Sequence, residues 1–400
     1  MPARLLMKAD VAAAAEILGE PRAPLRVALF SGNYNYVMDG PVRALNKLVA
    51  HVESRGHEAL VFAPTSKKSA LDHAGELVSV PSIALPGSRS EYRLGLGLSG
   101  GARRRLDAFR PTIIHVAAPD WLGLSALNYA QRRNIPAVAS FHTRFDTYPR
   151  YYGMAWLERH ITGYMRYFYR RCERVYAPSQ SMVDELARDG IGRDVRLWAR
   201  GVDKSLFNPD RRDLVWRRAA GVSDDDVLVA FVGRIVLEKG IDIFAGAVRA
   251  AQEENRKIRA LIVGDGPERE RFRHLLPDGV FTGYLEGEAL ARAYASADIF
   301  FNPSVTETFG NVTLEAMASG LPAVCAAASG SRSLVDDGET GFLVADAKDV
   351  GGFACALTSL ARDADQRATM AANALLKSAG FDWDAILDRL IADYQAIVIR

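Results

Sequence analysis

The stretch VLVAFVGRIVLEKG, residues 227–240, indicates how the second half of the chain folds. It starts with a short apolar run, Val227–Gly233, that ends in glycine. Such a run is typical of a strand buried on both faces of a sheet. A helical stretch, Gly240–Asn255, follows after a loop that contains Arg234 and Lys239. The sequence therefore predicts a strand–loop–helix unit here.

The same unit recurs through the rest of the second half. A Gly-Asp-Gly-Pro turn at 264–267 starts a helix at Glu268. Further strands are predicted at 260–264, 280–283, 299–303, 323–326 and 341–344, and further helices at 288–296 and 313–319. Apolar strands that alternate with helices indicate βα units and a parallel sheet.

The first half shows the same alternation. Strands are predicted at 25–30, 58–63, 112–116, 137–141 and 175–177, with a helix at 41–55. The boundary between the halves falls near Gly201–Asp210, where Asn208-Pro209-Asp210 breaks regular structure. The fold class is therefore α/β, with two Rossmann-like domains and ligands outside the carboxyl ends of the strands.

Composition is consistent with a globular protein of two domains. The chain has 400 residues, of which 49% are hydrophobic and 24% charged, and it contains no apolar run long enough to span a membrane. Residues 1–24 form a short N-terminal extension that we read as helical, not as an export signal. The three cysteines are too far apart for a disulfide framework or a metal site, so we expect a reducing, cytoplasmic location.

Charge is distributed unevenly between the halves. Residues 1–200 contain 28 Lys and Arg against 18 Asp and Glu, a net charge of +10, and the remainder carries −8. Either the first half faces an anionic partner, such as nucleic acid or a membrane surface, or the imbalance is uninformative.

A predicted amphipathic helix at 156–174 adds to this basic character. Its polar side carries Arg159, Arg166, Arg170 and Arg174. With Arg103–Arg105 and Lys67–Lys68, this stripe is expected to dock on anionic lipid; the alternative is a solvated helix face. Nucleic acid is disfavoured because the helix has a large apolar face and the chain has no recognition motif.

The segment SVTETFGNVTLEAMA, residues 304–318, is the densest in possible chemistry. Glu307 lies in the loop after a strand, and Glu315 lies in the first turns of the next helix. Gly310 permits close backbone approach, and a helix start offers free N–H groups to an anion such as a diphosphate. On spacing alone, both glutamates could equally be ordinary helix-start charges.

Several motifs together resemble the retaining family-4 glycosyltransferases of the GT-B fold, in which two Rossmann-like domains face each other across a cleft. These are the Gly-Arg-x4-Lys-Gly segment, the Gly-Asp-Gly-Pro turn, the two glutamates eight residues apart, and Gly-Leu-Pro-Ala-Val at 320–324. The segments at 141–148 (FHTRFDTY) and 197–203 (LWARGVD) resemble the subgroup of mannosyl-, glucosyl- and sulfoquinovosyl-transferases that act on lipids.

The resemblance implies a role for each matching residue. Arg234 and Lys239 are expected to bind the donor diphosphate and stabilise the charge that develops as the sugar leaves. Glu307 should face the transferred sugar, and His142 should hydrogen-bond it near the reaction centre. Gly40 should lie near the phosphates, although Pro41 departs from the family's usual pattern in that loop.

The rest of the donor site follows from the 304–318 segment. Glu315 should hold the ribose hydroxyls, and Phe309 and Gly310 should offer backbone N–H groups to the sugar. Thr308, Asn311 and Val312 complete the expected donor-binding set. No metal or cofactor is expected, because the Arg–Lys pair can neutralise the diphosphate and the three Asp-x-Asp triplets, at 224–226, 363–365 and 382–384, are typical of turns or helix caps.

The resemblance thus implies a hexosyltransferase that retains anomeric configuration. The donor would be GDP-mannose or a UDP-hexose, and the acceptor a membrane glycolipid or its precursor, reached from the inner face of the cytoplasmic membrane. A polysaccharide or polyprenyl-linked acceptor, or a nucleotide-sugar epimerase, is the alternative. An NAD-dependent oxidoreductase is disfavoured, because residues 31–36 (SGNYNY) do not match Gly-x-Gly-x-x-Gly after the first strand.

Two domains are predicted: residues 25–203 bind the acceptor, and residues 204–380 bind the nucleotide-sugar. The glycine-rich segment 81–99 is expected to form a loop on the acceptor side. The amphipathic stretch 381–400 is expected to cross back as a helix and pack on the first domain, with Ile386, Leu387, Leu390, Ile391 and Tyr394 on its apolar face.

Overall fold

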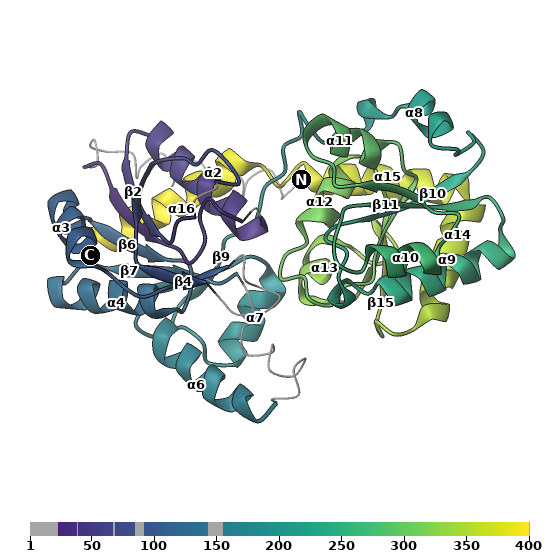
Figure 1. Ribbon diagram of the computed structural model, residues 1–400. Coiled ribbons are helices and arrows are strands. Elements are labelled where there is room, and N and C mark those ends of the chain that lie inside the picture. Colours follow the sequence, from purple (N-terminus) through teal and green to yellow (C-terminus); the bar gives the residue numbers. More distant parts are fainter. Residues whose placement is uncertain (1–22, 38, 67–68, 85–91, 143–154, 400) are drawn as a thin grey trace, which may run out of the picture.

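Two α/β lobes stand side by side in the computed structural model (Figure 1). It describes residues 23–399 except 38, 67–68, 85–91 and 143–154. Each lobe is built on its own parallel sheet with helices on both faces, which confirms the predicted fold class. Four predicted features lie outside the described residues: most of the N-terminal extension, the pair Lys67–Lys68, the middle of the 81–99 loop, and the motif after His142.

The first lobe contains a seven-stranded sheet in the order β3-β2-β1-β6-β7-β8-β9. Its strands are β1 (Arg26–Phe30), β2 (Glu58–Ala63), β3 (Glu76–Ser79), β6 (Ile113–Val116), β7 (Ala137–Ser140), β8 (Arg174–Ala177) and β9 (Val195–Leu197). Its helices are α2 (Gly40–Ser54), α3 (Gly100–Phe109), α4 (Trp121–Arg133), η3 (Ala155–Leu157), α6 (Glu158–Tyr169) and α7 (Gln180–Arg188).

The second lobe contains a six-stranded sheet in the order β12-β11-β10-β13-β14-β15. Its strands are β10 (Val227–Val232), β11 (Ile258–Val263), β12 (Val280–Gly283), β13 (Ile299–Asn302), β14 (Ala323–Ala326) and β15 (Gly341–Val344). Its helices are η4 (Pro209–Arg211), α8 (Leu214–Ala219), η5 (Leu237–Lys239), α9 (Ile241–Glu254), α10 (Arg269–Leu275), α11 (Gly287–Ala295), α12 (Asn311–Ala318), α13 (Ser329–Leu334), α14 (Val350–Arg362) and α15 (Ala364–Ser378).

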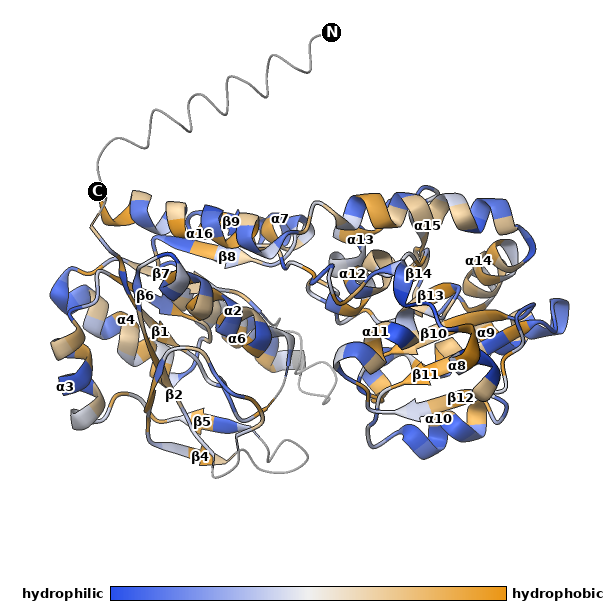
Figure 2. Ribbon diagram, turned by 90° about the horizontal axis from the view of Figure 1, so that it is seen from above, coloured by the Kyte–Doolittle hydropathy of each residue, from blue (hydrophilic) through white to orange (hydrophobic). Residues whose placement is uncertain are grey.

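Alternating side chains of each strand fill two apolar layers, one on either face of its sheet. In β1, Ala28 and Phe30 pack on one side while Val27 and Leu29 pack on the other. Figure 2 shows these apolar strands between helices whose outer faces are hydrophilic. The burial explains why the strands read as continuous apolar runs rather than as an alternating pattern.

Polar caps start several of the helices. Asp39 begins α2 by accepting a hydrogen bond from Val42 N at 2.9 Å, and Pro41 occupies the first turn, where its missing N–H costs nothing. Asp363 and Asp382 cap α15 and α16 (Trp383–Val398) in the same way. Two of the three Asp-x-Asp triplets are therefore helix caps, as predicted.

The predicted helix at 156–174 is wrong at its C-terminal end. Helix α6 ends at Tyr169, and Arg174 lies in β8, where it is 4% exposed. There it forms ion pairs with Asp194 and Asp393. Arg174 therefore belongs to the interior. The other three arginines of the predicted stripe, Arg159, Arg166 and Arg170, are exposed.

The segment 81–99, predicted as a loop, is partly a hairpin. Strands β4 (Ser82–Ala84) and β5 (Arg93–Gly95) pair antiparallel at its two ends. Arg93 stabilises the pairing, since its Nε donates to Ser82 Oγ at 2.8 Å. The predicted acceptor-side loop is therefore closed at its base by a two-stranded sheet.

The last helix, α16, lies against the first lobe, beside α2, although it follows the second lobe in sequence (Figure 1). The five residues predicted for its apolar face are all buried, in the layer that also holds Leu45 and Leu48 of α2. Where the chain crosses back, Val202 N donates to Phe381 O at 3.0 Å. A Cβ on Gly201 would lie 2.5 Å from the Trp383 ring, so the two crossing segments touch.

Candidate active site

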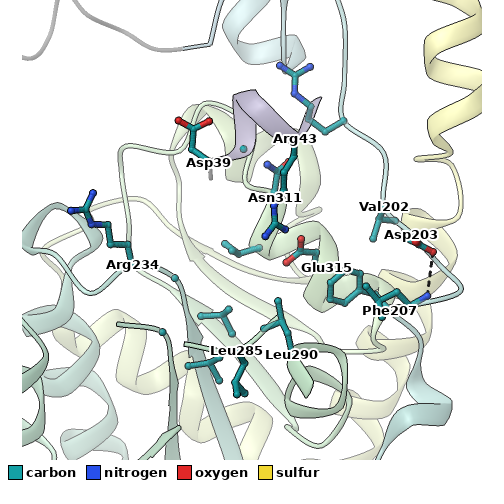
Figure 3. Close-up of a pocket in the computed structure, with 18 of the residues that line it drawn as sticks. Asp39, Arg43, Val202, Asp203, Phe207, Arg234, Leu285, Leu290, Asn311 and Glu315 are labelled. Carbon is teal, nitrogen blue, oxygen red and sulfur yellow. Dashed lines mark hydrogen bonds between the residues drawn. The ribbon is translucent and has the colours of Figure 1, made fainter. Parts of the chain in front are cut away.

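A cavity of about 710 Å³ opens between the two lobes (Figure 3). The first lobe contributes the start of α2 and the segment 200–207. The second contributes the ends of β10 and β11, the loop after β12, and the start of α12. Because parallel strands of one sheet end along the same edge, this is where ligands of such folds are expected.

Two glycine-rich turns of the second lobe pack directly on each other at the cavity wall. Gly264, at φ +136°, is so close to Gly233 that a Cβ would lie 2.0 Å from the Gly233 carbonyl oxygen. A Cβ on Gly266 would lie 2.2 Å from the Ile235 oxygen. The Gly-Asp-Gly-Pro turn therefore supports the loop from which Arg234 reaches the cavity.

Lys239 and Glu307 form an ion pair in the second lobe, outside the set of residues that line the cavity. Lys239 ends the short helix η5, and Gly240 then turns the chain in the left-handed region, at φ +72°. The backbone of Glu307 is held in place, because its main-chain carbonyl accepts a hydrogen bond from Gly330 N at 3.0 Å. Both side chains are partly buried, at 26% and 17% exposed, so the pair is only partly screened by solvent.

The start of α12 meets α2 across the cleft. Gly310, at φ +94°, precedes the helix, and Asn311 and Val312 line the cavity in its first turn. A Cβ on Gly40 would lie 2.7 Å from Asn311 Nδ2. Glycine at position 40 therefore allows the lobes to approach each other closely.

Glu315 lies deeper in the cavity, one turn further along α12. Tyr294 OH donates to its carboxylate at 3.1 Å. Burial raises the pKa of Glu315 to about 7, and the positive charge of Arg43 opposes that shift. In Figure 3, Arg43, Asn311 and Glu315 lie close together.

His142 lies just behind the cleft, after β7, and does not line the cavity. Both of its ring nitrogens are engaged, with Arg200 at 3.0 Å and Ser140 at 2.9 Å. Its backbone carbonyl accepts a hydrogen bond from Thr308 Oγ1 at 3.1 Å. The structure therefore joins His142 to the 304–310 loop through its backbone rather than through its ring.

The sequence-predicted residues thus fall into four groups. Five line the cavity: Gly40, Arg234, Asn311, Val312 and Glu315. Lys239 and Glu307 form an ion pair with each other, and Thr308 donates a hydrogen bond to the His142 carbonyl; none of these four residues lines the cavity. Phe309 is buried against Phe381, with ring centroids 6.1 Å apart, and Gly310 forms the turn before α12.

Other lining residues were not predicted. Arg43 and Lys47 lie four residues apart on α2, so they share a helix face that points into the cavity. An apolar wall consists of Val202, Phe207, Leu285 and Leu290 (Figure 3). Arg200 stands in the quoted 197–203 motif, but only the folded chain places it at the cavity.

No group of His, Cys, Asp and Glu in the part of the chain that the structure describes is arranged to hold a metal ion. The described helices also include none that is long and apolar enough to cross a membrane.

Comparison with known proteins gives two family matches that follow the two lobes. Residues 38–206 match the model described as Glycosyltransferase Family 4, and residues 226–363 match Glycosyl transferases group 1. In the solved structures, sucrose-phosphate synthase from Thermosynechococcus elongatus has the same fold, with a TM-score of 0.74 at 20% identity over 93% of this chain and 99% of that chain.

Two curated relatives are similar over most of their length. A GDP-mannose-dependent alpha-mannosyltransferase of Mycolicibacterium smegmatis is 36% identical over 94% of this chain and 98% of its own. An alpha-monoglucosyldiacylglycerol synthase of Streptococcus pneumoniae is 25% identical over 82% of this chain and 77% of its own.

Proposed function

Because the chain belongs to glycosyltransferase family 4, whose members transfer a sugar from a nucleotide-sugar with retention of configuration, we propose that it moves a hexose from GDP-mannose or a UDP-hexose onto a membrane glycolipid or its precursor. The observation that carries this proposal is the cavity between the lobes, which Arg234 and Glu315 both line.

The cavity suggests an order for the parts of the donor. The apolar wall around Phe207, Leu285 and Leu290 suits a nucleobase, and Glu315 is placed to accept hydrogen bonds from ribose hydroxyls. The diphosphate would then lie near Arg234 and the start of α12, where N–H groups and the helix dipole favour an anion. The sugar would extend toward Glu307.

Charge stabilisation is the main task of such a site. As the bond to the anomeric carbon breaks, negative charge grows on the departing diphosphate, and Arg234 and Lys239 would offset it. Glu307 would hold the sugar and keep Lys239 in place. Two cations near the diphosphate would supply the charge that a divalent ion supplies elsewhere, so we expect transfer without a metal.

The nature of the substrates is supported by the relatives. The mycobacterial relative uses GDP-mannose by its name, and the streptococcal one makes a glucosyl lipid by its name. A lipid acceptor must be reached at a membrane surface. Helix α6, which projects from the first lobe (Figure 1), exposes Tyr167 at 57%, and Trp156 just before it at 67%, beside Arg159 and Arg166. Exposed aromatic rings beside arginines suit the interface of an anionic bilayer.

Charge reversal on α6 should weaken membrane binding. The double variant Arg159→Glu/Arg166→Glu is expected to bind anionic vesicles at least roughly tenfold less well, since each basic residue near such a surface contributes about 1 kcal/mol. Sedimentation with phosphatidylglycerol vesicles measures this. The double variant Arg249→Glu/Arg256→Glu changes exposed arginines of the second lobe and should bind like the unchanged protein. Equal losses in both variants would count against α6 as the contact.

Donor affinity should depend on pH through Glu315. Its pKa is raised to about 7, so the carboxylate is present above that pH and becomes protonated below it. Affinity for GDP or UDP is therefore expected to fall by up to about tenfold per pH unit below 7, because a protonated carboxyl accepts fewer and weaker hydrogen bonds than the carboxylate does. Calorimetry at pH 6, 7 and 8 measures this. The Glu315→Gln variant should bind more weakly, with a flat profile; the same slope in both proteins would assign the dependence to another group.

The proposed function is tested by turnover with a panel of UDP- and GDP-sugars, in the presence of a chelator. Anionic vesicles that contain diacylglycerol, phosphatidylinositol or a glycolipid serve as acceptors. Transfer of one sugar to a lipid would identify both substrates. Nucleotide binding with transfer only to a polyprenyl-linked acceptor would support the alternative acceptor, and conversion of the donor without any acceptor would support an epimerase. Absence of nucleotide binding would overturn the assignment of the cavity.

A further inference from the structure

The hydrogen bonds of His142 fix the form of its ring. Arg200 Nη2 lies 3.0 Å from Nδ1, and Ser140 Oγ lies 2.9 Å from Nε2. A guanidinium can only donate, so Nδ1 must accept. The ring is then neutral, with its single hydrogen on Nε2 and directed at Ser140, because a protonated Nδ1 would face the Arg200 donors.

Arg200 is itself held rigidly. It is 4% exposed, donates to the Trp198 carbonyl at 2.7 Å and lies 4.4 Å over the Trp198 ring. Among the described residues, none of its hydrogen bonds is with a carboxylate. Burial lowers the pKa of Arg200 to about 9, so it still carries its charge at neutral pH.

The chain of hydrogen bonds continues from His142 toward the interior of the first lobe. Ser140 Oγ also lies 2.9 Å from His115 Nε2, and His115 Nδ1 lies 2.5 Å from the hydroxyl of Tyr394 on α16. All three of these side chains are buried. The His142 ring is therefore connected to the last helix of the chain.

The backbone carbonyl of His142 contacts the second lobe. Its carbonyl accepts from Thr308 Oγ1 at 3.1 Å, and the Thr308 carbonyl accepts from Ser179 Oγ of the first lobe at 2.8 Å. Thr308 is thus held twice by the first lobe, and it is the residue next to Glu307. Glu307 therefore adjoins a residue that the first lobe fixes at two points.

We propose that Arg200 is a positioning residue for sugar transfer: by holding His142 in its neutral form against Ser140, it sets the carbonyl that fastens Thr308 and so places Glu307. The inference rests on the proposed function and adds a residue to it. Among the residues that the structure describes, the charged or titratable groups that face the His142 ring are Arg200 and, through Ser140, His115, and the Trp198 ring lies 6.0 Å away. Burial first, then the charge of Arg200, lowers the pKa of His142 well below its usual value.

Kinetics of Arg200→Met and Arg200→Gln test the proposal. Arg200→Met removes both the donor and the charge, and kcat is expected to fall about 100-fold while KM for the donor changes less than about threefold, since misplacement by roughly 1 Å costs that much in rate. Arg200→Gln keeps an N–H donor for Nδ1, so its kcat should be about tenfold higher than that of Arg200→Met. Arg218→Met, at an exposed arginine of the second lobe, is the control and should leave both constants unchanged. A large rise in KM without a fall in kcat would mean that Arg200 contacts the donor directly, and would overturn the proposal.

Two further measurements test the proposal independently of these rate constants. Because Arg200 disfavours protonation of His142, the acid limb of the kcat profile should move to higher pH in Arg200→Met; an unmoved limb would contradict the proposal. Nitrogen-15 NMR of the seven histidine rings, with the His142 signal assigned by its loss in His142→Asn, should show hydrogen on Nε2 only. Hydrogen on Nδ1 would overturn the proposal. This NMR result needs no turnover, so it stands or falls separately from the proposed function.

Discussion

Replacement of Lys239 by methionine is expected to lower kcat/KM about 10³-fold with any donor that the unchanged protein uses. Methionine keeps much of the apolar stem but removes the charge that would offset the departing diphosphate, and loss of one such group costs about 10²–10³ in rate. It also leaves the partly buried carboxylate of Glu307 without its ion-pair partner. Initial rates with a radiolabelled donor measure the effect.

A second variant separates charge loss from misfolding. Lys257→Met removes an exposed lysine whose ion pair with Asp225 spans 3.8 Å, and it should leave the rate unchanged. The melting temperatures of both variants show whether each is folded. A folded Lys239→Met protein that turns over at the unchanged rate would exclude Lys239 from the reaction.

Gly264→Ala is expected to destabilise the second lobe by roughly 3–5 kcal/mol and to abolish nucleotide binding. Its backbone, at φ +136°, disfavours any side chain, and the new Cβ would lie 2.0 Å from the Gly233 carbonyl. Relief of that overlap requires the two turns to separate, which moves Arg234 away from the cavity. Urea unfolding and nucleotide titration measure the two effects.

The matched control for this variant is Gly338→Ala. Gly338 has a positive φ of +78°, but nothing lies within 4 Å of the position that a Cβ would take there. It therefore isolates the cost of the backbone conformation, about 1–2 kcal/mol. If Gly264→Ala costs no more than Gly338→Ala, the contact between the two turns contributes nothing to stability.

Much of the fold was predictable because local sequence and burial agree. Strands β2, β12, β14 and β15 begin and end at the predicted residues, and β10 differs by one residue. Strands β2, β10 and β14 are short, largely buried apolar runs, so the same side chains that favour a strand also fill the core. The edge strands β12 and β15 are only partly buried, and flanking glycines mark their ends. The apolar face of α16 was predictable for the same reason.

Arg174 was not predictable, because its partners are distant in sequence. Its position in a helical periodicity favoured α6, yet Asp393 on the last helix and Asp194 before β9 hold it in the interior. Only the tertiary fold brings two carboxylates to one arginine. Local periodicity therefore misplaced it on a docking surface.

The candidate site was predictable as a set of motifs but not as a geometry. Motifs identified Glu307, Glu315 and the Arg234 loop, whereas Arg43 and Lys47 belong to a helix with no distinctive pattern of its own. Nor could sequence indicate that both ring nitrogens of His142 are engaged, since Arg200 is 58 residues away. Residues that act through long-range contacts carry no local signal.

The place of α16 has a consequence for how the chain is made. The second lobe consists of residues that emerge from the ribosome consecutively, whereas one face of the first lobe is covered by the last helix of the chain, Trp383–Val398. During synthesis, the apolar layer that α16 shares with α2 and β1 stays incomplete until that helix emerges. The lobe made first is therefore expected to be completed last, and a nascent chain stalled before Trp383 should be a substrate for chaperones.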